Sequence, residues 1–201
     1  MSGDKARENR LDRELMQRIR RDDAAAFEQL YARYARPLMN FFYRMCYDTV
    51  AAEDYLQETF LRVWRARRTY RPVGKVSTWL FQIAKNFWLN ERAKTKLRPF
   101  HEKTALIGGR DEAATELRDP RAGTSPAAAA QAGETEAAIR AAVAELSEKL
   151  RLVFVLCRYQ DMAYAHAAEV LGIPLGTVKS RMAAAEKTLR DKLRPHLGDR
   201  P

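Results

Sequence analysis

Aromatic, basic and amide side chains alternate along the stretch from residue 79 to residue 92. Helical spacing turns one face of this stretch toward a core, and Ser77 can cap the helix. The core-facing residues would be Leu80, Ile83, Ala84 and Phe87, and the exposed ones Trp79, Gln82, Lys85, Asn86, Trp88, Asn90 and Arg92. Such a surface suits single-stranded nucleic acid, because cations hold phosphates, rings stack on unpaired bases and amides contact base edges. The alternative, that Trp79 and Trp88 are core residues of a solvated basic helix, stays open.

A second group of short polar and basic side chains lies near the C-terminus, on another segment with helical periodicity. Its inner stripe would be Val178, Met182, Ala185 and Leu189, and its outer or marginal residues Thr177, Lys179, Ser180, Arg181, Ala184 and Lys187. A short helix over 162–171 precedes it, and Gly172 stands where a left-handed residue ends a helix. Pro174 suits the first turn of the following helix. Two helices joined by a tight glycine turn predict a helix-turn-helix that binds DNA, since a plain hairpin rarely opens its second helix in this way.

An acidic surface precedes the basic one. Every charged residue in 48–61 is acidic, whereas Glu91 is the only acid in 62–98. Residues 53–64 have the spacing of an amphipathic helix, with an inward stripe of Leu56, Phe60, Val63 and Trp64. The opposite side carries Asp54, Gln57, Glu58 and Leu61. An acidic patch beside a basic, aromatic patch predicts a protein contact next to a nucleic-acid contact.

The overall composition favours a polyanionic partner. The 201 residues carry a formal net charge of +10 with a pI of about 9.8, and 46% are hydrophobic, enough to bury a core in at least part of the chain. A merely soluble basic protein would share these values.

We expect no enzyme and no cofactor, because no phosphate-cradling Gly-Lys-Ser/Thr loop and no His-Glu-x-x-His pair is present. Cys46 and Cys157 stand alone, which predicts small buried residues rather than zinc ligands.

Helical periodicity and breaker residues predict an all-α chain with two small domains. Residues 1–21 would be a charged tail leading into a helix, 22–98 the first domain, 99–134 a flexible linker poor in large apolar residues, and 135–197 the domain with the helix-turn-helix. The chain shows no signal peptide and no apolar run of about eighteen residues. We therefore expect a cytoplasmic protein without membrane insertion.

Several helix boundaries follow from local signals. Asp22 or Asp23 can cap the next helix, Pro37 should kink it or start a new segment, and Asp48-Thr49 should begin the acidic helix. Further helices are expected over Thr135–Leu146 and, capped by Ser147, over Glu148–Tyr159.

These stretches together resemble the extracytoplasmic-function group of sigma-70-type bacterial sigma factors. Residues 52–64 look like the core-polymerase-binding helix of that group, residues 76–86 like its promoter-melting segment, and residues 171–181 like its C-terminal recognition helix. The similarity covers about 26–96 and 136–193, which leaves out only the tails and the linker.

The resemblance implies a factor that binds core RNA polymerase and promoter DNA. It assigns the polymerase contact to Asp54, Gln57, Glu58, Leu61 and Trp64. It assigns minus-ten recognition and capture of the melted non-template strand to Arg71, Lys75, Ser77, Thr78, Trp79, Gln82, Lys85, Asn86, Asn90 and Arg92. Contact with the double-stranded minus-thirty-five element would fall to Thr177, Lys179, Ser180, Arg181, Ala184 and Lys187. An anti-sigma protein that covers both domains is a further implied partner.

The chain also departs from the pattern of that group. Ala163 stands where Ser or Thr is common before the first helix of the helix-turn-helix, and alanine cannot cap a helix. His166 and Ala168 replace residues that are commonly acidic. Two rival functions remain: a helix-turn-helix regulator that never joins polymerase, which would not explain the acidic helix, and a DNA-processing enzyme such as a recombinase, for which no catalytic residues are found.

Overall fold

The protein is built from helices. The computed structural model describes residues 2–71, 73–97 and 126–197, and every regular element within these ranges is helical. The all-α prediction is therefore confirmed. None of the helices described is long and apolar enough to cross a membrane. The expected linker at 99–134 lies mostly outside the described residues, although 126–134 belong to a helix.

The N-terminal half consists of α1 (Ser2–Ile19), α2 (Ala24–Cys46), α3 (Thr49–Ala66), the 3₁₀ turn η1 (Arg67–Thr69) and α4 (Val76–Leu97). Acidic caps begin two of these helices: of the two candidates Asp22 and Asp23 it is Asp23 that caps α2, and Asp48 caps α3. The Asp23 side chain accepts a hydrogen bond from the Ala26 amide, and the Asp48 side chain accepts one from the Ala51 amide, both at 3.0 Å. Helix α2 continues through Pro37, so no new segment begins there.

The C-terminal half consists of α5 (Pro126–Ala144), α6 (Glu148–Phe154), the π-helical segment η2 (Val155–Tyr159), α7 (Tyr164–Leu171) and α8 (Leu175–Leu197). Helix α5 starts at Pro126 rather than at Thr135. Ser147 precedes α6 without a side-chain capping bond. Gly172 ends α7 in the left-handed region at φ 68°, and its amide donates to the Ala168 carbonyl at 2.8 Å.

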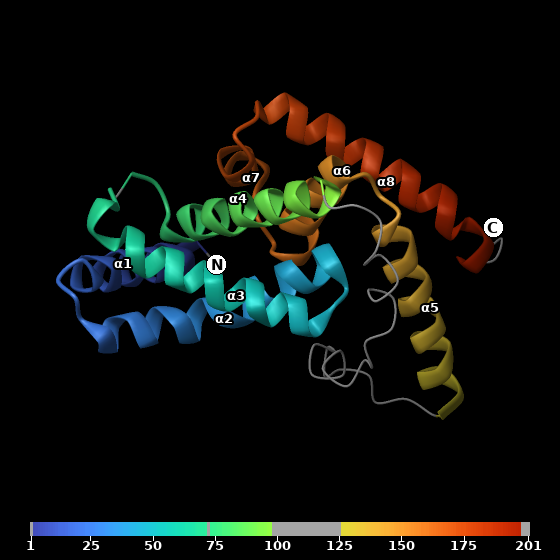
Figure 1. The fold of residues 1–201 in the computed structure, drawn as a ribbon. Helices are drawn as coiled ribbons and strands as arrows, with labels where there is room; N and C mark the ends of the chain where they lie inside the picture. The colour runs from blue at the N-terminus through green and yellow to red at the C-terminus, as the bar shows by residue number, and fades with distance from the viewer. Residues whose placement is uncertain (1, 72, 98–125, 198–201) are drawn as a thin grey trace.

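The two halves share one hydrophobic core. Helix α4 lies between α2 and α3 on one side and α7 on the other (Figure 1). The rings of Phe41 and Phe81 meet edge-on with centroids 5.7 Å apart, and both are buried. Their cluster joins residues of α2, α4 and α7, among them Phe42, Ala84, Ala167 and Val170. Because these apolar surfaces are removed from water together, the helix-turn-helix packs onto α4.

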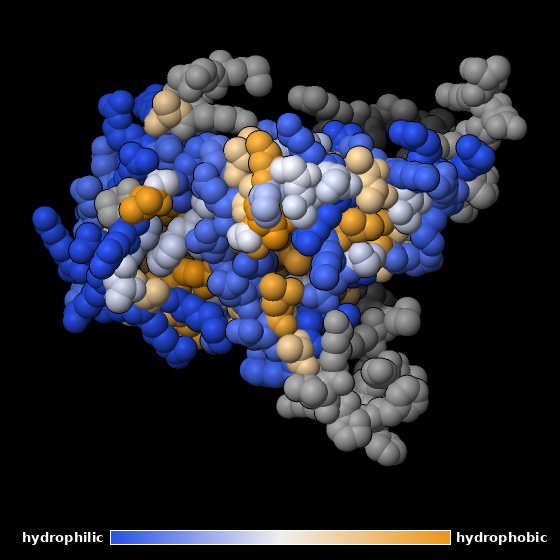
Figure 2. All heavy atoms as spheres, turned by 90° about the horizontal axis from the view of Figure 1, so that it is seen from above, coloured by the Kyte–Doolittle hydropathy of each residue, from blue (hydrophilic) through white to orange (hydrophobic). Residues whose placement is uncertain are grey.

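A second core fixes the chain that leads into α4. It joins Leu15, Met16 and Ile19 of α1 to Tyr70, Val76 and Leu80. Seen from above, the end of the molecule that carries α1 and η1 is mostly hydrophilic, and apolar side chains gather in small patches nearer the middle (Figure 2). The N-terminal helix therefore packs into the domain rather than standing apart as a tail.

Candidate nucleic-acid and partner interfaces

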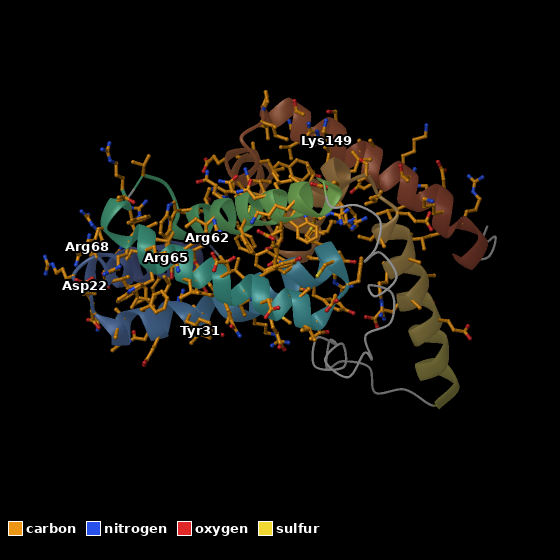
Figure 3. The ribbon with its side chains drawn as sticks, in the orientation of Figure 1. Asp22, Tyr31, Arg62, Arg65, Arg68 and Lys149 are labelled. Carbon is orange, nitrogen blue, oxygen red and sulfur yellow. The ribbon has the colours of Figure 1, made fainter. Side chains whose placement is uncertain are left out.

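Helix α3 presents an acidic face with an apolar centre. Asp54, Gln57 and Leu61 are exposed, and Leu61 keeps 50% of its surface in solvent. Glu58 is less free than the sequence suggests, since its Oε1 lies 2.8 Å from Arg62 Nε, one helical turn away. Arg65 lies 3.9 Å from the same oxygen (Figure 3). The face therefore offers Asp54 and Gln57 as its free polar groups.

Of Leu61 and Trp64, Leu61 is the one that points outward, as helical spacing favours. The Trp64 ring is half-buried, with its centroid 5.0 Å from that of Phe27 and the Arg67 guanidinium 4.1 Å above it. Tyr31 of α2 adds an apolar group that the sequence did not single out. It is 40% exposed, and its ring centroid lies 4.6 Å from that of Phe60 (Figure 3).

The start of α4 brings together polar groups of different exposure. Arg71 is exposed, whereas Lys75, Ser77 and Trp79 are half-buried. The Trp79 ring packs on Tyr70, with centroids 4.8 Å apart. Thr78 is only 5% exposed, and its hydroxyl has no hydrogen-bond partner. Thr78 thus faces the interior, away from any ligand at the surface.

Trp88 is a core residue, so of the two readings that its helical spacing left open the exposed one is wrong. Its side chain is 3% exposed and packs edge-on against Tyr55 with ring centroids 5.8 Å apart. The Arg92 guanidinium lies 5.6 Å from its ring. The physical reason is that α4 is packed on opposite sides, by α2 and α3 and by α7, so the inward stripe is wider than one face. Phe81, at 3% exposure, is buried for the same reason.

Several of the predicted minus-ten residues contact the C-terminal half. Gln82 Nε2 donates to the Glu169 carbonyl of α7 at 2.9 Å, and Lys75 Nζ lies 3.5 Å from His166 Nδ1. Arg92 Nε lies 3.9 Å from a carboxylate oxygen of Glu148. Burial also lowers the pKa of Lys85. Asn86 and Asn90 stay exposed.

The outer face of α8 is open. Its inner stripe is buried as predicted, with Val178 and Ala185 at 0% exposure. Lys179, Ser180, Ala184 and Lys187 are exposed, and Thr177 and Arg181 are half-buried. The Ser180 hydroxyl donates to the Thr177 carbonyl at 3.1 Å, so only its acceptor positions remain for a ligand. Helix α8 thus keeps a basic surface in solvent while α4 is largely covered.

A cavity of about 770 Å³ lies where the halves meet beside Ser77. It is lined by residues of α1, α2, the start of α4, the end of η2, the segment before α7 and α7 itself, including Asp12, Tyr34, Lys75, Asp161 and His166. Among the described residues no group of three or more His, Cys, Asp or Glu side chains could hold a metal ion. Burial raises the pKa of the Cys157 thiol to about 11, which suits a structural residue.

Family models match both halves of the chain. A model described as Sigma-70 region 2 matches residues 30–98, and one described as Sigma-70, region 4 matches residues 136–189. The chain is 30% identical to the RNA polymerase sigma-H factor of Pseudomonas aeruginosa, over 92% of this chain and 95% of that protein. It is 28% identical to the ECF RNA polymerase sigma factor SigW of Bacillus subtilis, over 89% of this chain and 95% of that protein.

Solved structures share the fold. CnrH in complex with the cytosolic domain of CnrY has a TM-score of 0.66 and 24% identity, covering 91% of this chain and 97% of CnrH. The sigma factor RpoE in complex with the anti-sigma factor NepR from Bartonella quintana has a TM-score of 0.61 and 20% identity, covering 83% of this chain and 96% of RpoE. Helix α1 lies before the residues that the region 2 model matches.

Proposed function

Because the chain belongs to the extracytoplasmic-function group of the sigma-70 family of RNA polymerase sigma factors, we propose that it directs core RNA polymerase to promoters and helps to open them. One observation favours a polymerase-binding factor over a protein that only binds DNA. Helix α3 exposes Leu61 between polar groups on a face that no other described helix covers, next to the basic segment that leads into α4. A helix-turn-helix regulator that works without polymerase would not require this exposed face on α3.

Each of three surfaces binds a different partner. The α3 face docks on polymerase through Asp54, Gln57 and Leu61, with Glu58 and Trp64 at its margin. The segment 71–92 receives the melted non-template strand, since its cations and rings favour the strand-separated state and shift the population toward it. The outer face of α8 enters the major groove at the minus-thirty-five element, with Lys179 and Arg181 contributing most of the contact.

Promoter opening in this scheme requires the two halves to separate. Gln82 is bonded to α7, and Lys75 lies beside His166, so a DNA strand must displace α7 to bind these side chains in the closed arrangement, in which α7 packs on α4. The docking face of α3 and the outer face of α8 remain open. Core polymerase favours the separated form by binding the two halves at distant positions, because a ligand shifts an equilibrium by its differential affinity for the two states.

Two further assignments belong to this proposal. An anti-sigma protein that holds the halves together would keep the factor inactive; RpoE, which shares the fold, forms a complex with the anti-sigma factor NepR. We also assign the protein to the cytoplasm, where polymerase and promoter DNA are found.

Initiation with purified components tests the proposal. Core RNA polymerase and a library of promoter fragments with randomised minus-ten and minus-thirty-five elements are incubated with and without the full chain, and run-off transcripts are sequenced. We expect transcripts from a consensus subset only when the chain is present, together with co-elution of the chain with polymerase. DNA binding without co-elution or initiation would favour the regulator instead.

A further inference from the structure

Val73 is an apolar side chain held almost fully in solvent. It is 86% exposed, the highest value among the large apolar residues that the described part of the chain exposes, and Val50 of α3 follows at 69%. A single exposed apolar side chain is ordinary on a protein surface, so the surroundings of Val73 have to show whether it binds a ligand. Val73 lies among residues 71–75, the segment that leads into α4.

Buried residues hold both ends of this segment. Tyr70, just before it, is 5% exposed, and Val76, just after it, is 0% exposed. Both belong to the second core, which they share with residues of α1. The Tyr70 ring also packs on Trp79 of α4, with ring centroids 4.8 Å apart. The core therefore fixes where the segment begins and where it ends.

Backbone contacts shape the turn that carries Val73. The Val73 amide donates to the Arg71 carbonyl at 2.7 Å, and Arg13 Nη2 of α1 donates to the Gly74 carbonyl at 3.2 Å. Gly74 has φ +90°, a conformation that residues with a side chain rarely adopt. Valine is branched at Cβ, which restricts its χ1 angle. The Val73 methyl groups are therefore presented to solvent with little conformational freedom to lose on binding.

Cations flank Val73 within the segment. Arg71 precedes it and is exposed, and Lys75 follows it and is half-buried. Cations in such positions attract the phosphates of a nucleic-acid strand. The Val73 side chain has no hydrogen-bond donor or acceptor, so it gains free energy from that strand only by removing apolar surface from water. Its partner on the strand must therefore be an apolar group.

The 5-methyl group of thymine is the apolar group that the edges of DNA bases offer. Apolar side chains also act as wedges between stacked bases, and long residues such as Phe, Leu and Met serve this purpose. The side chain of Val73 ends at its two γ-methyl groups and reaches less far than these. Contact with a thymine methyl is therefore the arrangement that the size of Val73 favours.

We propose that Val73 recognises a thymine of the minus-ten element in the melted non-template strand, through contact with the thymine 5-methyl group. Arg71 and Lys75 hold the strand by its phosphates, and Val73 contributes the preference for one base. The proposal rests on the sigma-factor function and adds to it a residue that sets specificity at one promoter position.

Deoxyuridine tests this contact directly, because it pairs like thymine but lacks the 5-methyl group. The promoter that the randomised library selects is resynthesised with each minus-ten thymine of the non-template strand replaced in turn by deoxyuridine. Each template competes with the unmodified promoter for initiation by core polymerase and the full chain. We expect one replacement to lower initiation about fourfold, the effect of removing one methyl group from an apolar contact. The same replacements in the template strand should have no effect.

Substitutions of Val73 should change the ratio of initiation from thymine to initiation from deoxyuridine at that position. In Val73→Ala the ratio should fall to about one, because the contact is already lost and removal of the DNA methyl costs nothing more. Val73→Ile keeps an apolar side chain and should keep the preference for thymine. Thermal unfolding of each variant accompanies the assay, and substitution of so exposed a side chain should leave the midpoint unchanged.

Val50→Ala is the matched control. Val50 is also an exposed valine, but it lies in the first turn of α3, whereas the segment with Val73 follows the last turn of that helix. The control variant loses the same two methyl groups from the surface and should discriminate between thymine and deoxyuridine as the wild type does.

The outcomes separate this proposal from the function on which it rests. Base recognition by Val73 would be overturned by a selected minus-ten element without thymine, by equal initiation from every deoxyuridine promoter, or by an unchanged ratio in Val73→Ala. An equal fall of the ratio in Val50→Ala would also contradict it. If Val73→Ala instead loses activity on all sequences alike and a pre-melted template restores it, Val73 is a wedge. Failure of the wild-type chain to direct initiation from any library member would contradict the sigma-factor function itself.

Discussion

The exposure of single side chains on α3 and α8 shows which of them are the stronger candidates for contact with polymerase or DNA. Glu58, predicted as part of the docking face, is paired with Arg62, so Leu61 and Asp54 are the stronger candidates for contact. On α8, Arg181 and Lys179 are the basic side chains near the start of the recognition helix. Exposed apolar groups at the centre of an interface commonly contribute more to binding than peripheral charges.

Leu61→Ser should weaken polymerase binding by about 1–2 kcal/mol, because a central apolar contact is lost. Val50→Ser is the matched control, since Val50 lies on the same helix and is 69% exposed. Affinity is measured by titrating labelled polymerase with each variant. Equal affinities for Leu61→Ser and the wild type would remove Leu61 from the docking face.

Arg181→Ala should weaken binding to the minus-thirty-five element by about 1–3 kcal/mol. The loss should be smaller at high salt if Arg181 contacts phosphate, since releasing a counterion into a more concentrated salt solution yields less free energy. Binding to a duplex with the selected element is followed by anisotropy over a range of salt concentrations. Arg20→Ala, an exposed charge on the turn after α1, should bind like the wild type, and a similar loss there would point to net charge alone.

At the scale of elements, the first helix of the helix-turn-helix lacks a side-chain cap at its N-terminus. Ala163 occupies the N-cap position of α7 with extended backbone angles, φ −58° and ψ 143°, and forms no side-chain capping bond. The sequence already indicated this, because alanine carries no acceptor for the free amides of the first turn.

Ala163→Ser should therefore stabilise the protein by about 1 kcal/mol, the usual contribution of a side-chain cap. Thermal or urea unfolding monitored by circular dichroism measures the change. Ala165→Ser is the control, since this exposed residue lies inside the helix, where serine gives no cap and lowers helix propensity slightly. An equal or lower midpoint for Ala163→Ser would show that the α7 terminus does not limit stability.

At the scale of the whole molecule, the closed arrangement joins the halves by polar as well as apolar contacts. Arg151 Nη1 donates to the Met45 carbonyl at 3.0 Å, and the Arg44 guanidinium lies 4.3 Å above the Tyr159 ring. These contacts connect α2 to α6 and η2, away from the docking face and from the outer face of α8. They can be weakened without altering the proposed binding residues.

Arg44→Ala should shift the equilibrium toward the separated form by about two- to thirtyfold, the range expected for a cation–π contact of 0.5–2 kcal/mol. The radius of gyration from X-ray scattering, or energy transfer between dyes on the two halves, reports the change. Initiation should rise at limiting polymerase, since opening would then cost less. Arg20→Ala removes the same charge elsewhere and should leave both readouts unchanged. A compact Arg44→Ala variant would argue that other contacts dominate the interface.

The sequence by itself predicted most of the helices, a cap at Asp22 or Asp23, the start of α3 at Asp48-Thr49, the glycine that ends α7 and the inner stripe of α8. These features depend on residues a few positions apart, so local periodicity and capping chemistry are enough to predict them. Only the tertiary structure decided that Trp88 is buried, that α1 packs on the segment before α4 and that α7 covers Gln82. Each of these depends on which distant helix covers a given face, and the spacing within one helix shows that a face is apolar without showing what lies against it.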